Sequence, residues 1–376
     1  MIYFDNAATG GFKPSAVYES AVNAMKYLNA NAGHSGHKLA VLAESYVYKT
    51  RKILAEFFGA DSCERVIFTK NCTEALNLAI LGTVKRGGNV VVSAYEHNSV
   101  LRPLYALKRQ GIITLTVVAP QNGAVLEEDI AKALTPKTYL VCLTGASNVT
   151  GEINDYEAIG ALLKKRGILF LLDGAQVCGH AFVNMQKQNI DILCVAGHKG
   201  MNALQGAGCL IFNKNVNVEP TFYGGSGTET FAETPSGYPE LLECGTLNLP
   251  AIVSLYEGAA ANMNCMQFKQ KTLISLTKRL CDGLNENRVV RLYSRPNPIG
   301  IVSFSYGDRF SQEIAGLLSD YYDIAVRGGY HCSPLCHKFL NTEQNGLVRV
   351  SLSEMNTAGE IDEFLSAVND LPRHLV

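Results

Sequence analysis

Residues 189–212 read NIDILCVAGHKGMNALQGAGCLIF, and this stretch decides how the rest of the chain is interpreted. The apolar run Ile192–Ala196 ends abruptly at Gly197-His198-Lys199, and a glycine-bearing loop separates it from a second apolar run at 209–212. Short apolar runs bounded by glycine favour buried strands. The stretch therefore predicts a strand, a polar loop and a second strand, with Lys199 just past the end of the first.

A lysine in this place has two interpretations. An ordinary loop lysine extends its ammonium group into water. A Schiff-base lysine is partly desolvated, so that an amine with a reference pKa of about 10.4 can react in its neutral form. Another apolar run, at 168–172, ends in Asp173-Gly174-Ala175-Gln176, and a carboxylate at the end of a buried parallel strand is unfavourable unless a cation meets it. Pyridoxal phosphate requires such a pair, a lysine for its aldehyde and a carboxylate for its ring nitrogen.

These two segments carry a resemblance to a known family. Asp173-Gly174-Ala175-Gln176 followed by Ala196-Gly197-His198-Lys199 resembles the signature of class V aminotransferases, and within them the cysteine desulfurase and selenocysteine lyase branch. The resemblance extends from Tyr3 to about Asn356. It implies an α/β protein with the aspartate aminotransferase-like fold of PLP-dependent transferases. Residues 15–255 are expected to form a large cofactor-binding domain with a mostly parallel sheet, and residues 1–14 and 256–376 a smaller α+β lobe.

The pattern of apolar runs favours the same architecture independently. Between residues 65 and 212, short apolar runs alternate with helical stretches, as in parallel sheets. Long helical stretches are predicted at 15–28, 39–58 and 249–284, and the last would lead into the smaller lobe.

Composition narrows the class of protein. The 376 residues include 33 Lys or Arg and 34 Asp or Glu, so the net charge of -1 gives no reason to expect nucleic acid or an anionic membrane as a partner. The opening residues contain no basic segment followed by an apolar one, and no apolar run approaches about 18 residues, so we predict no secretory signal and no membrane span. The 11 cysteines lie mostly inside apolar runs, which favours reduced thiols. A cytoplasmic protein is expected.

The resemblance implies where a cofactor would bind. Asn71-Cys72-Thr73-Glu74 opens a helix, whose free N–H groups and roughly half a positive charge suit a phosphate, although a simple helix cap is the alternative. His97 would stack on the ring and pass protons, where the alternative is a polar loop residue. Thr246 would reach the phosphate of a neighbouring subunit in a homodimer. The implied cofactor-binding set is Cys72, Thr73, His97, Asn148, Asp173, Gln176, His198, Lys199 and Thr246.

The chain departs from the family pattern at three places. Relatives usually carry serine or threonine two residues before His198, where this chain has Ala196. Losing that hydrogen bond to a charged phosphate would weaken binding by about 1.5–3 kcal/mol if nothing replaces it. Ala203-Leu204 stands where relatives commonly show Gly-Pro, and His34 where an arginine is often found. The role of His34 stays open.

A second reactive centre is predicted near the carboxyl end of the chain. His331-Cys332-Ser333-Pro334-Leu335-Cys336-His337 holds two cysteines and two histidines, but a structural zinc site needs a second ligand cluster, which the sequence lacks, so no metal is expected. A reactive thiol needs a nearby cation or histidine, and Arg327 and His331 are close in sequence. The resemblance implies that Cys332 attacks the sulfur of the substrate.

The implied reaction removes sulfur from L-cysteine and leaves alanine. By resemblance, Lys199, Cys332 and His97 are catalytic, while Ala8, Asn148, Arg327 and Arg349 bind substrate, with the planar fork of Arg349 holding the carboxylate. The alternatives are a selenocysteine lyase, another β-elimination or aminotransferase reaction on the same cofactor, and a non-catalytic scaffold or sulfur-carrier partner with this fold. A separate sulfur-acceptor protein is a possible partner of the enzyme.

Overall fold

A seven-stranded sheet forms the centre of the large domain in the described residues of this computed structural model, which are 1–33, 35–120 and 123–375. The strand order is β2-β8-β7-β6-β5-β3-β4, and every neighbouring pair is parallel except the two pairs made by β8. The strands are β2 (Val66–Thr69), β3 (Asn89–Ser93), β4 (Thr114–Val118), β5 (Thr138–Thr144), β6 (Leu169–Asp173), β7 (Ile192–Ala196) and β8 (Gly208–Phe212). The prediction of a mostly parallel sheet is confirmed.

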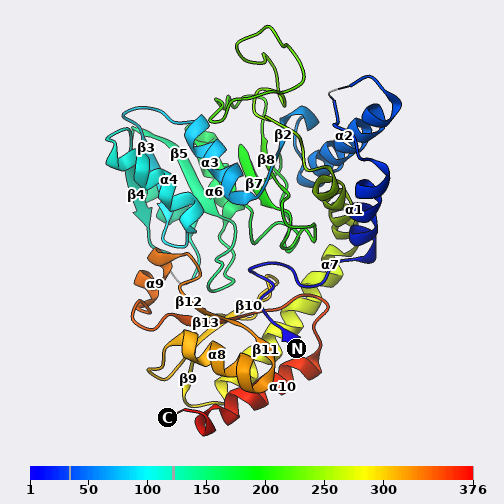
Figure 1. Ribbon diagram of the computed structural model, residues 1–376. Coiled ribbons are helices and arrows are strands. Elements are labelled where there is room, and N and C mark those ends of the chain that lie inside the picture. Colours follow the sequence, from blue (N-terminus) through cyan, green and yellow to red (C-terminus); the bar gives the residue numbers. More distant parts are fainter. Residues whose placement is uncertain (34, 121–122, 376) are drawn as a thin grey trace.

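Helices cover both faces of this sheet (Figure 1), which explains why its strands are apolar throughout. In β6, Phe170 and Leu172 belong to one hydrophobic core and Leu171 to the other, because successive side chains of a strand point to opposite faces. One face carries α3 (Cys72–Gly82) and α4 (Asn98–Arg109), and the other carries α2 (Lys38–Phe58), α5 (Glu127–Ala133) and α6 (Tyr156–Arg166).

The smaller domain is built around a four-stranded antiparallel sheet in the order β12-β13-β10-β9. Its strands are β9 (Val290–Leu292), β10 (Ile301–Tyr306), β12 (Arg327–Gly329) and β13 (Leu347–Ser351), and its helices are α8 (Ser311–Tyr322), α9 (Pro334–Leu340) and α10 (Ala358–Asp370). The chain start joins this domain, because β1 (Ile2–Tyr3) pairs in parallel with β11 (Ile324–Ala325). Both ends of the chain therefore contribute to it.

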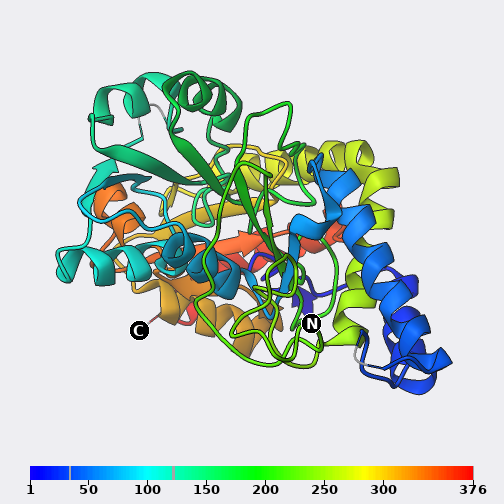
Figure 2. The same ribbon diagram turned by 90° about the horizontal axis from the view of Figure 1, so that it is seen from above.

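One long helix, α7 (Leu249–Asn285), connects the two domains. Its first half packs in the core of the large domain and its second half in the core of the smaller one. Viewed from above, α7 lies with α1 (Ser15–Tyr27) and α2 along one edge of the molecule (Figure 2). None of the helices in the described ranges combines the length and the apolar character that crossing a bilayer requires.

The carboxyl ends of β3, β5, β6 and β7 meet at one edge of the large sheet, because these strands run in the same direction. Open α/β sheets bind their ligands at this edge. The segments that follow these strands carry His97, Asn148, Asp173 and Lys199. The fold thus assembles residues that lie far apart in the sequence.

Candidate active site

A cavity of about 500 Å³, open to solvent, lies at this edge of the sheet. It is lined by all but one of the predicted cofactor-binding residues, namely Cys72, Thr73, His97, Asn148, Asp173, Gln176, His198 and Lys199. The exception is Thr246, which is exposed on the loop before α7. One chain therefore places both Lys199 and Asp173, the predicted lysine and carboxylate, at the same cavity.

Asp173 is a buried carboxylate at the end of β6, with 2% of its surface exposed. Its Oδ1 accepts hydrogen bonds from the Ala175 N–H at 3.0 Å and from the Cys72 thiol at 3.5 Å. Burial nevertheless raises the pKa of Asp173, although the Ala175 N–H and the charge of Lys199 act in the other direction. A carboxylate in such surroundings gains most from a further positive partner.

Lys199 follows β7 and contributes to the wall of the same cavity. Burial lowers the pKa of the Lys199 amine, and the charges of Arg349 and Arg327 lower it further, against the opposing effect of Asp173 and Cys72. Lowering the pKa enlarges the neutral fraction of the amine, which is the form that attacks a carbonyl carbon. The environment therefore suits a Schiff-base lysine.

The amino terminus of α3 opens into the cavity through Asn71, Cys72 and Thr73. Asn71 caps the helix by accepting a hydrogen bond from the Glu74 N–H at 2.9 Å. Thr73 Oγ1 lies 2.8 Å from the hydroxyl of Ser99, which belongs to the first turn of α4. Ser99 thus brings to the cavity a hydroxyl of the kind that Ala196 lacks. Nothing in the sequence around Ser99 predicted this contribution.

The hydrogen bonds of His97 determine its tautomer. Its Nδ1 accepts from the Ser99 N–H at 3.1 Å and lies 2.9 Å from the Ser99 hydroxyl. An accepting Nδ1 places the proton of the neutral ring on Nε2. Burial lowers the pKa of His97 to about 4, and the nearby charges of Lys199 and Arg327 contribute. The ring is therefore neutral at physiological pH, with a donor at Nε2.

Glu96 is a fully buried carboxyl that the sequence analysis did not single out. Its Oε1 accepts hydrogen bonds from the Ser93 hydroxyl and from the Thr144 N–H, the latter at 3.0 Å, while Oε2 has no partner among the described residues. Ser93 ends β3 and Thr144 ends β5. Glu96 therefore ties together two strand ends and fixes the turn that carries His97.

The wild type should lose stability as the pH rises from about 5 to about 8, and replacing Glu96 with glutamine should remove this loss. Burial raises the pKa of Glu96 to about 8 from an ordinary value of 4.5, so between these values the folded chain keeps a proton that the unfolded chain releases. Stability then falls as pH rises through this window. In urea unfolding, the free energy of unfolding of E96Q relative to that of the wild type should increase by roughly a few kcal/mol as the pH rises from 5 to 8. A difference that does not change with pH would contradict this.

Arg349, on β13, is buried between the two domains with 1% of its surface exposed. One terminal nitrogen donates to the Asn148 carbonyl at 3.0 Å and the other forms an ion pair with Asp5 at 2.9 Å. Its Nε is buried and has no partner within the described ranges. Arg349 lies outside the lining of the cavity but contacts Asn148, which is part of that lining, so contact of the guanidinium with a substrate carboxylate stays a prediction.

The side chain of Asn148 makes hydrogen bonds within the protein that the resemblance did not imply. Its amide donates to the His331 carbonyl at 2.6 Å, and its Oδ1 accepts from the Ser333 hydroxyl at 2.6 Å. Asn148 thus holds the backbone on both sides of Cys332 against the large domain. Contact of its side chain with cofactor or substrate stays a prediction.

Cys332 is exposed and lies between β12 and α9, near the rim of the cavity and outside its lining. Its carbonyl accepts a hydrogen bond from the Asn98 N–H at 2.7 Å, directly beside His97. His331 and Cys332 both have positive φ angles, 49° and 59°, a conformation that costs about 1–3 kcal/mol per residue and is typical of functional sites. The fold therefore presents the thiol in a constrained position.

His331 does not supply the positive charge that its position in the sequence suggested. It is 3% exposed, its Nε2 lies 3.0 Å from the Leu347 carbonyl, and burial together with Arg349 places its pKa well below the ordinary value. The ring is neutral, and Arg349 is a cation that interacts electrostatically with Cys332. No cluster of three or more metal-ligating side chains occurs in the part of the chain that the structure describes.

The remaining predicted residues lie around the cavity. Gln176 donates from Nε2 to the Ala7 carbonyl at 3.2 Å, which brings the Ala7-Ala8 segment to the site. His198 lies 3.1 Å from the Thr9 hydroxyl, and burial with the charge of Lys199 lowers its pKa to about 4. Arg327 is half-buried on β12. Their direct contacts with ligands stay predictions.

These residues fit pyridoxal phosphate. Asp173 is a buried carboxylate in need of a cation, and both hydrogen bonds that the described residues give it end on Oδ1, which leaves Oδ2 for a ring nitrogen. Lys199 faces the same space with a lowered pKa. The free N–H groups of α3, with the hydroxyls of Thr73 and Ser99, suit a phosphate.

Comparisons with known proteins agree with this geometry. The family model described as aminotransferase class-V matches residues 2–364. A "Probable cysteine desulfurase" from Pyrococcus abyssi is 31% identical, with 100% of this chain and 95% of that protein covered. One of the same name from Methanothermobacter thermautotrophicus is 32% identical, with 96% and 92% covered. The apo structure of a cysteine desulfurase from Thermococcus onnurineus superposes with a TM-score of 0.90 at 32% identity, with 100% of this chain and 95% of that one covered.

Proposed function

The chain belongs to the class-V aminotransferase family, and from this premise we propose that it is a PLP-dependent cysteine desulfurase, which converts L-cysteine to L-alanine and receives the sulfur on Cys332 as a persulfide. The observation that carries the proposal is the placement of an exposed thiol beside the cavity that Lys199 and Asp173 share. An aminotransferase needs only the cavity. A desulfurase needs the thiol as well.

The cofactor would be held by residues already described. The amino terminus of α3, Thr73, Ser99 and His198 would bind its phosphate, Asp173 its ring nitrogen, and Lys199 its aldehyde carbon. When bound, pyridoxal phosphate supplies an electron sink for the bonds at the substrate Cα.

The side chains of the protein supply binding and proton transfer. Arg349 binds the substrate carboxylate through its unpaired donor, with the guanidinium held in place by Asp5 and Asn148. Lys199 removes the Cα proton, because its lowered pKa makes a neutral amine available. The neutral His97 donates a hydrogen bond from Nε2 beside the reacting groups.

Cys332 carries out the sulfur transfer. Its thiolate forms an S–S bond with the substrate sulfur while the Cβ–S bond breaks, and the bonding electron pair stays with the carbon skeleton. Cβ then takes up a proton from solvent, Lys199 returns the proton that it removed to Cα, and alanine leaves. The product is a persulfide on an exposed residue. Its outer sulfur is accessible to a separate sulfur-acceptor protein or to a small thiol.

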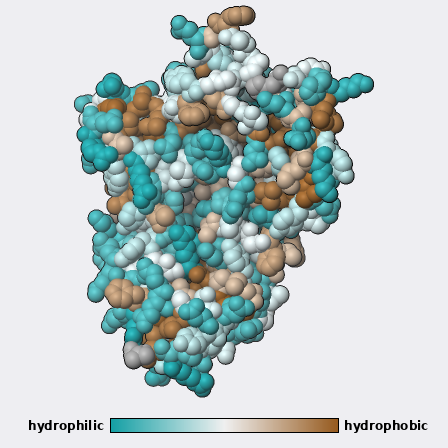
Figure 3. All heavy atoms as spheres, viewed as in Figure 1, coloured by the Kyte–Doolittle hydropathy of each residue, from teal (hydrophilic) through white to brown (hydrophobic). Residues whose placement is uncertain are grey.

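We also propose a homodimer. Large apolar side chains are exposed on α1 and α2, among them Tyr18, Met25, Val41 and Leu42. Brown patches lie over the region of these helices (Figure 3). Phe222, Tyr223 and Phe231 are exposed on the loop that leads to Thr246. Apolar surface of this extent favours an interface, which would place Thr246 near the phosphate of the other subunit. Light scattering should give the mass of two 40.8 kDa chains, and a single-chain mass would contradict this.

Product analysis tests the proposed reaction. PLP-loaded protein incubated with L-cysteine and a reducing thiol should release alanine and sulfide in equal amounts, because the thiol regenerates Cys332 after each turnover. Pyruvate in place of alanine would indicate β-elimination, and a keto acid with aminated cofactor would indicate transamination. Activity with L-selenocysteine alone would favour a selenocysteine lyase. Absence of cofactor binding would favour a scaffold.

A further inference from the structure

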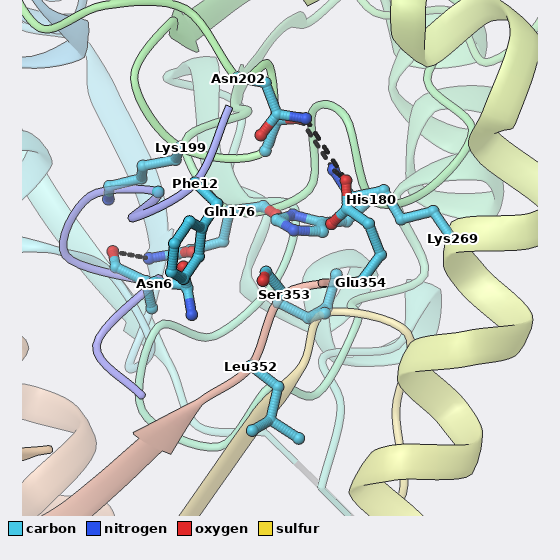
Figure 4. A pocket seen from close by; sticks show the side chains of 14 residues that line it. Asn6, Phe12, Gln176, His180, Lys199, Asn202, Lys269, Leu352, Ser353 and Glu354 are labelled. Carbon is cyan, nitrogen blue, oxygen red and sulfur yellow. Dashed lines mark hydrogen bonds and ion pairs between the residues drawn. The ribbon is translucent and has the colours of Figure 1, made fainter. Parts of the chain in front are cut away.

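A second, smaller cavity lies on the other side of Gln176 and Lys199, and it contains a buried ion pair that the proposed reaction does not use (Figure 4). Lys269, from α7, is 1% exposed, and its Nζ lies 3.6 Å from Oε1 of Glu354, which is 18% exposed. Burial lowers the pKa of Lys269, and the charge of Glu354 opposes this shift. Taking two charges out of water is unfavourable, so such a pair calls for a reason.

The second contact of Lys269 points to that reason. Its Nζ donates to the Gly200 carbonyl at 3.0 Å, and Asn262, also on α7, donates to the same carbonyl at 3.1 Å. Gly200 is the residue directly after Lys199. Its carbonyl therefore accepts two hydrogen bonds from one helix, next to the backbone from which the reactive amine extends.

Residues 197–207, between β7 and β8, form the loop that carries Lys199, which we call the lysine loop. This loop has little freedom to move. A Cβ on Gly200 would lie 2.5 Å from the Cys178 carbonyl, and a Cβ on Gly258 of α7 would lie 2.0 Å from the Met201 carbonyl, so backbone packs on backbone on both sides. The Lys199 carbonyl itself accepts from the Asn202 N–H at 2.8 Å. A displacement of α7 or of the Lys269 side chain is thus passed to the lysine loop.

Glu354 adds the smaller domain to this arrangement. It follows β13, so it belongs to the smaller domain, whereas Gly200 belongs to the large one. Its Oε1 also lies 3.5 Å from Nδ2 of Asn202, in the turn after Lys199 (Figure 4). The ion pair therefore joins the smaller domain, the connecting helix and the lysine loop at one point.

We propose that Lys269 is a positioning residue for Lys199, which acts through the Gly200 carbonyl, and that Glu354 links this hold to the packing of the smaller domain. The inference rests on the proposed role of Lys199. It assigns no contact with substrate or cofactor to Lys269. It does predict that the direction of the Lys199 amine depends on a pair of charges behind it.

Four variants separate positioning from stability. Lys269→Met leaves Glu354 buried without its cation, and Glu354→Gln leaves Lys269 without its anion, so both single variants should unfold at lower urea concentration. The double variant K269M/E354Q removes both charges and should recover much of the lost stability. Lys269→Arg keeps a cation and several donors. The exposed pair Lys278–Asp282 on the same helix, 2.6 Å apart, supplies the control variant Lys278→Met.

The decisive measurements are made on the double variant. Rates are expressed per bound cofactor, so a variant that folds less well still reports. We expect kcat to fall by about tenfold to a hundredfold with KM unchanged within about twofold, because a misplaced catalytic group weakens only the transition state. The pH midpoint at which the visible absorbance of the loaded protein changes should also shift. K269R should recover part of kcat. K278M should have the kcat, KM and absorbance midpoint of the wild type.

Two outcomes would overturn the inference. If K269M/E354Q is as stable and as active as the wild type, with the same absorbance titration, the ion pair has no effect on Lys199. If K269M/E354Q loses stability and keeps its kcat per cofactor, the pair is structural only. The absorbance titration needs no turnover. It therefore still tests the positioning if the wild type proves inactive toward L-cysteine, an outcome that would refute the proposed function alone.

Discussion

Lys199→Ala should lower turnover of L-cysteine by about 10⁴-fold or more without unfolding the protein, because catalytic residues that act as a unit lose nearly all their effect when one is removed. Lys199 is the one described lysine among the residues that line the cavity with Asp173, so the described residues offer no second amine there. Removing its side chain leaves the strand and loop contacts of β7 in place. The expected loss is therefore chemical.

Cofactor attachment separates this explanation from misfolding. Borohydride treatment of the loaded wild type should fix the cofactor covalently to the chain, and the same treatment of Lys199→Ala should not, although the α3 amino terminus and Asp173 should still bind it reversibly. Mass spectrometry of both proteins measures this. Lys70→Ala is the control, since Lys70 lies just before α3 and is 80% exposed. More than about 1% residual turnover in Lys199→Ala would exclude it as the catalytic base.

The sequence was sufficient to predict that Lys199 and Asp173 lie in the same site. Lys199 and Asp173 each follow a fully apolar run, and parallel strands in one sheet bring their carboxyl ends to the same edge, so their meeting follows from pattern and chain direction. The strand β7 and the helix α7 were predicted to within a residue or so of their observed bounds. Strand β4 was missed, because it is an edge strand that is only partly buried, and Thr114 and Thr116 interrupt its apolar residues.

Features that depend on side-chain partners were beyond the sequence. Glu96 looks like an ordinary acidic turn residue, and only the folded chain brings the Thr144 N–H to it. His331 looks like a cation beside a thiol, but packing buries it and leaves it neutral. Lys269 and Glu354 lie in separate elements with no shared motif, so their contact became visible only with the fold.

Cys332→Ser should abolish sulfur transfer from L-cysteine, with a fall in alanine production of about 10³-fold or more, because oxygen cannot accept the sulfur as a persulfide. Serine is nearly the same size and keeps the backbone, including the bond from the Asn98 N–H to the residue 332 carbonyl. Cofactor binding and the visible spectrum should therefore be unchanged. Selenium release from L-selenocysteine, whose carbon–selenium bond breaks more readily, should persist.

The neighbouring cysteine cannot take over this role. Cys336 lies in α9 with none of its surface exposed, and burial raises its pKa to about 12, so almost no thiolate is present at neutral pH. Cys332 is exposed, and a negative charge on its sulfur would act on the guanidinium of Arg349, whose pKa burial lowers and Asp5 and Cys332 raise. A thiolate at this position is therefore close to the group that would bind the substrate carboxylate.

Mass analysis after a single turnover without added thiol locates the sulfur. The wild type should gain one sulfur atom on the peptide that contains Cys332, and Cys332→Ser should gain none. Cys63→Ser, at a partly exposed cysteine on the short 3₁₀ turn before β2, is the matched control and should behave as the wild type. If Cys332→Ser still makes alanine from L-cysteine at the wild-type rate, a thiol other than that of Cys332 accepts the substrate sulfur, and the proposed role of Cys332 is wrong.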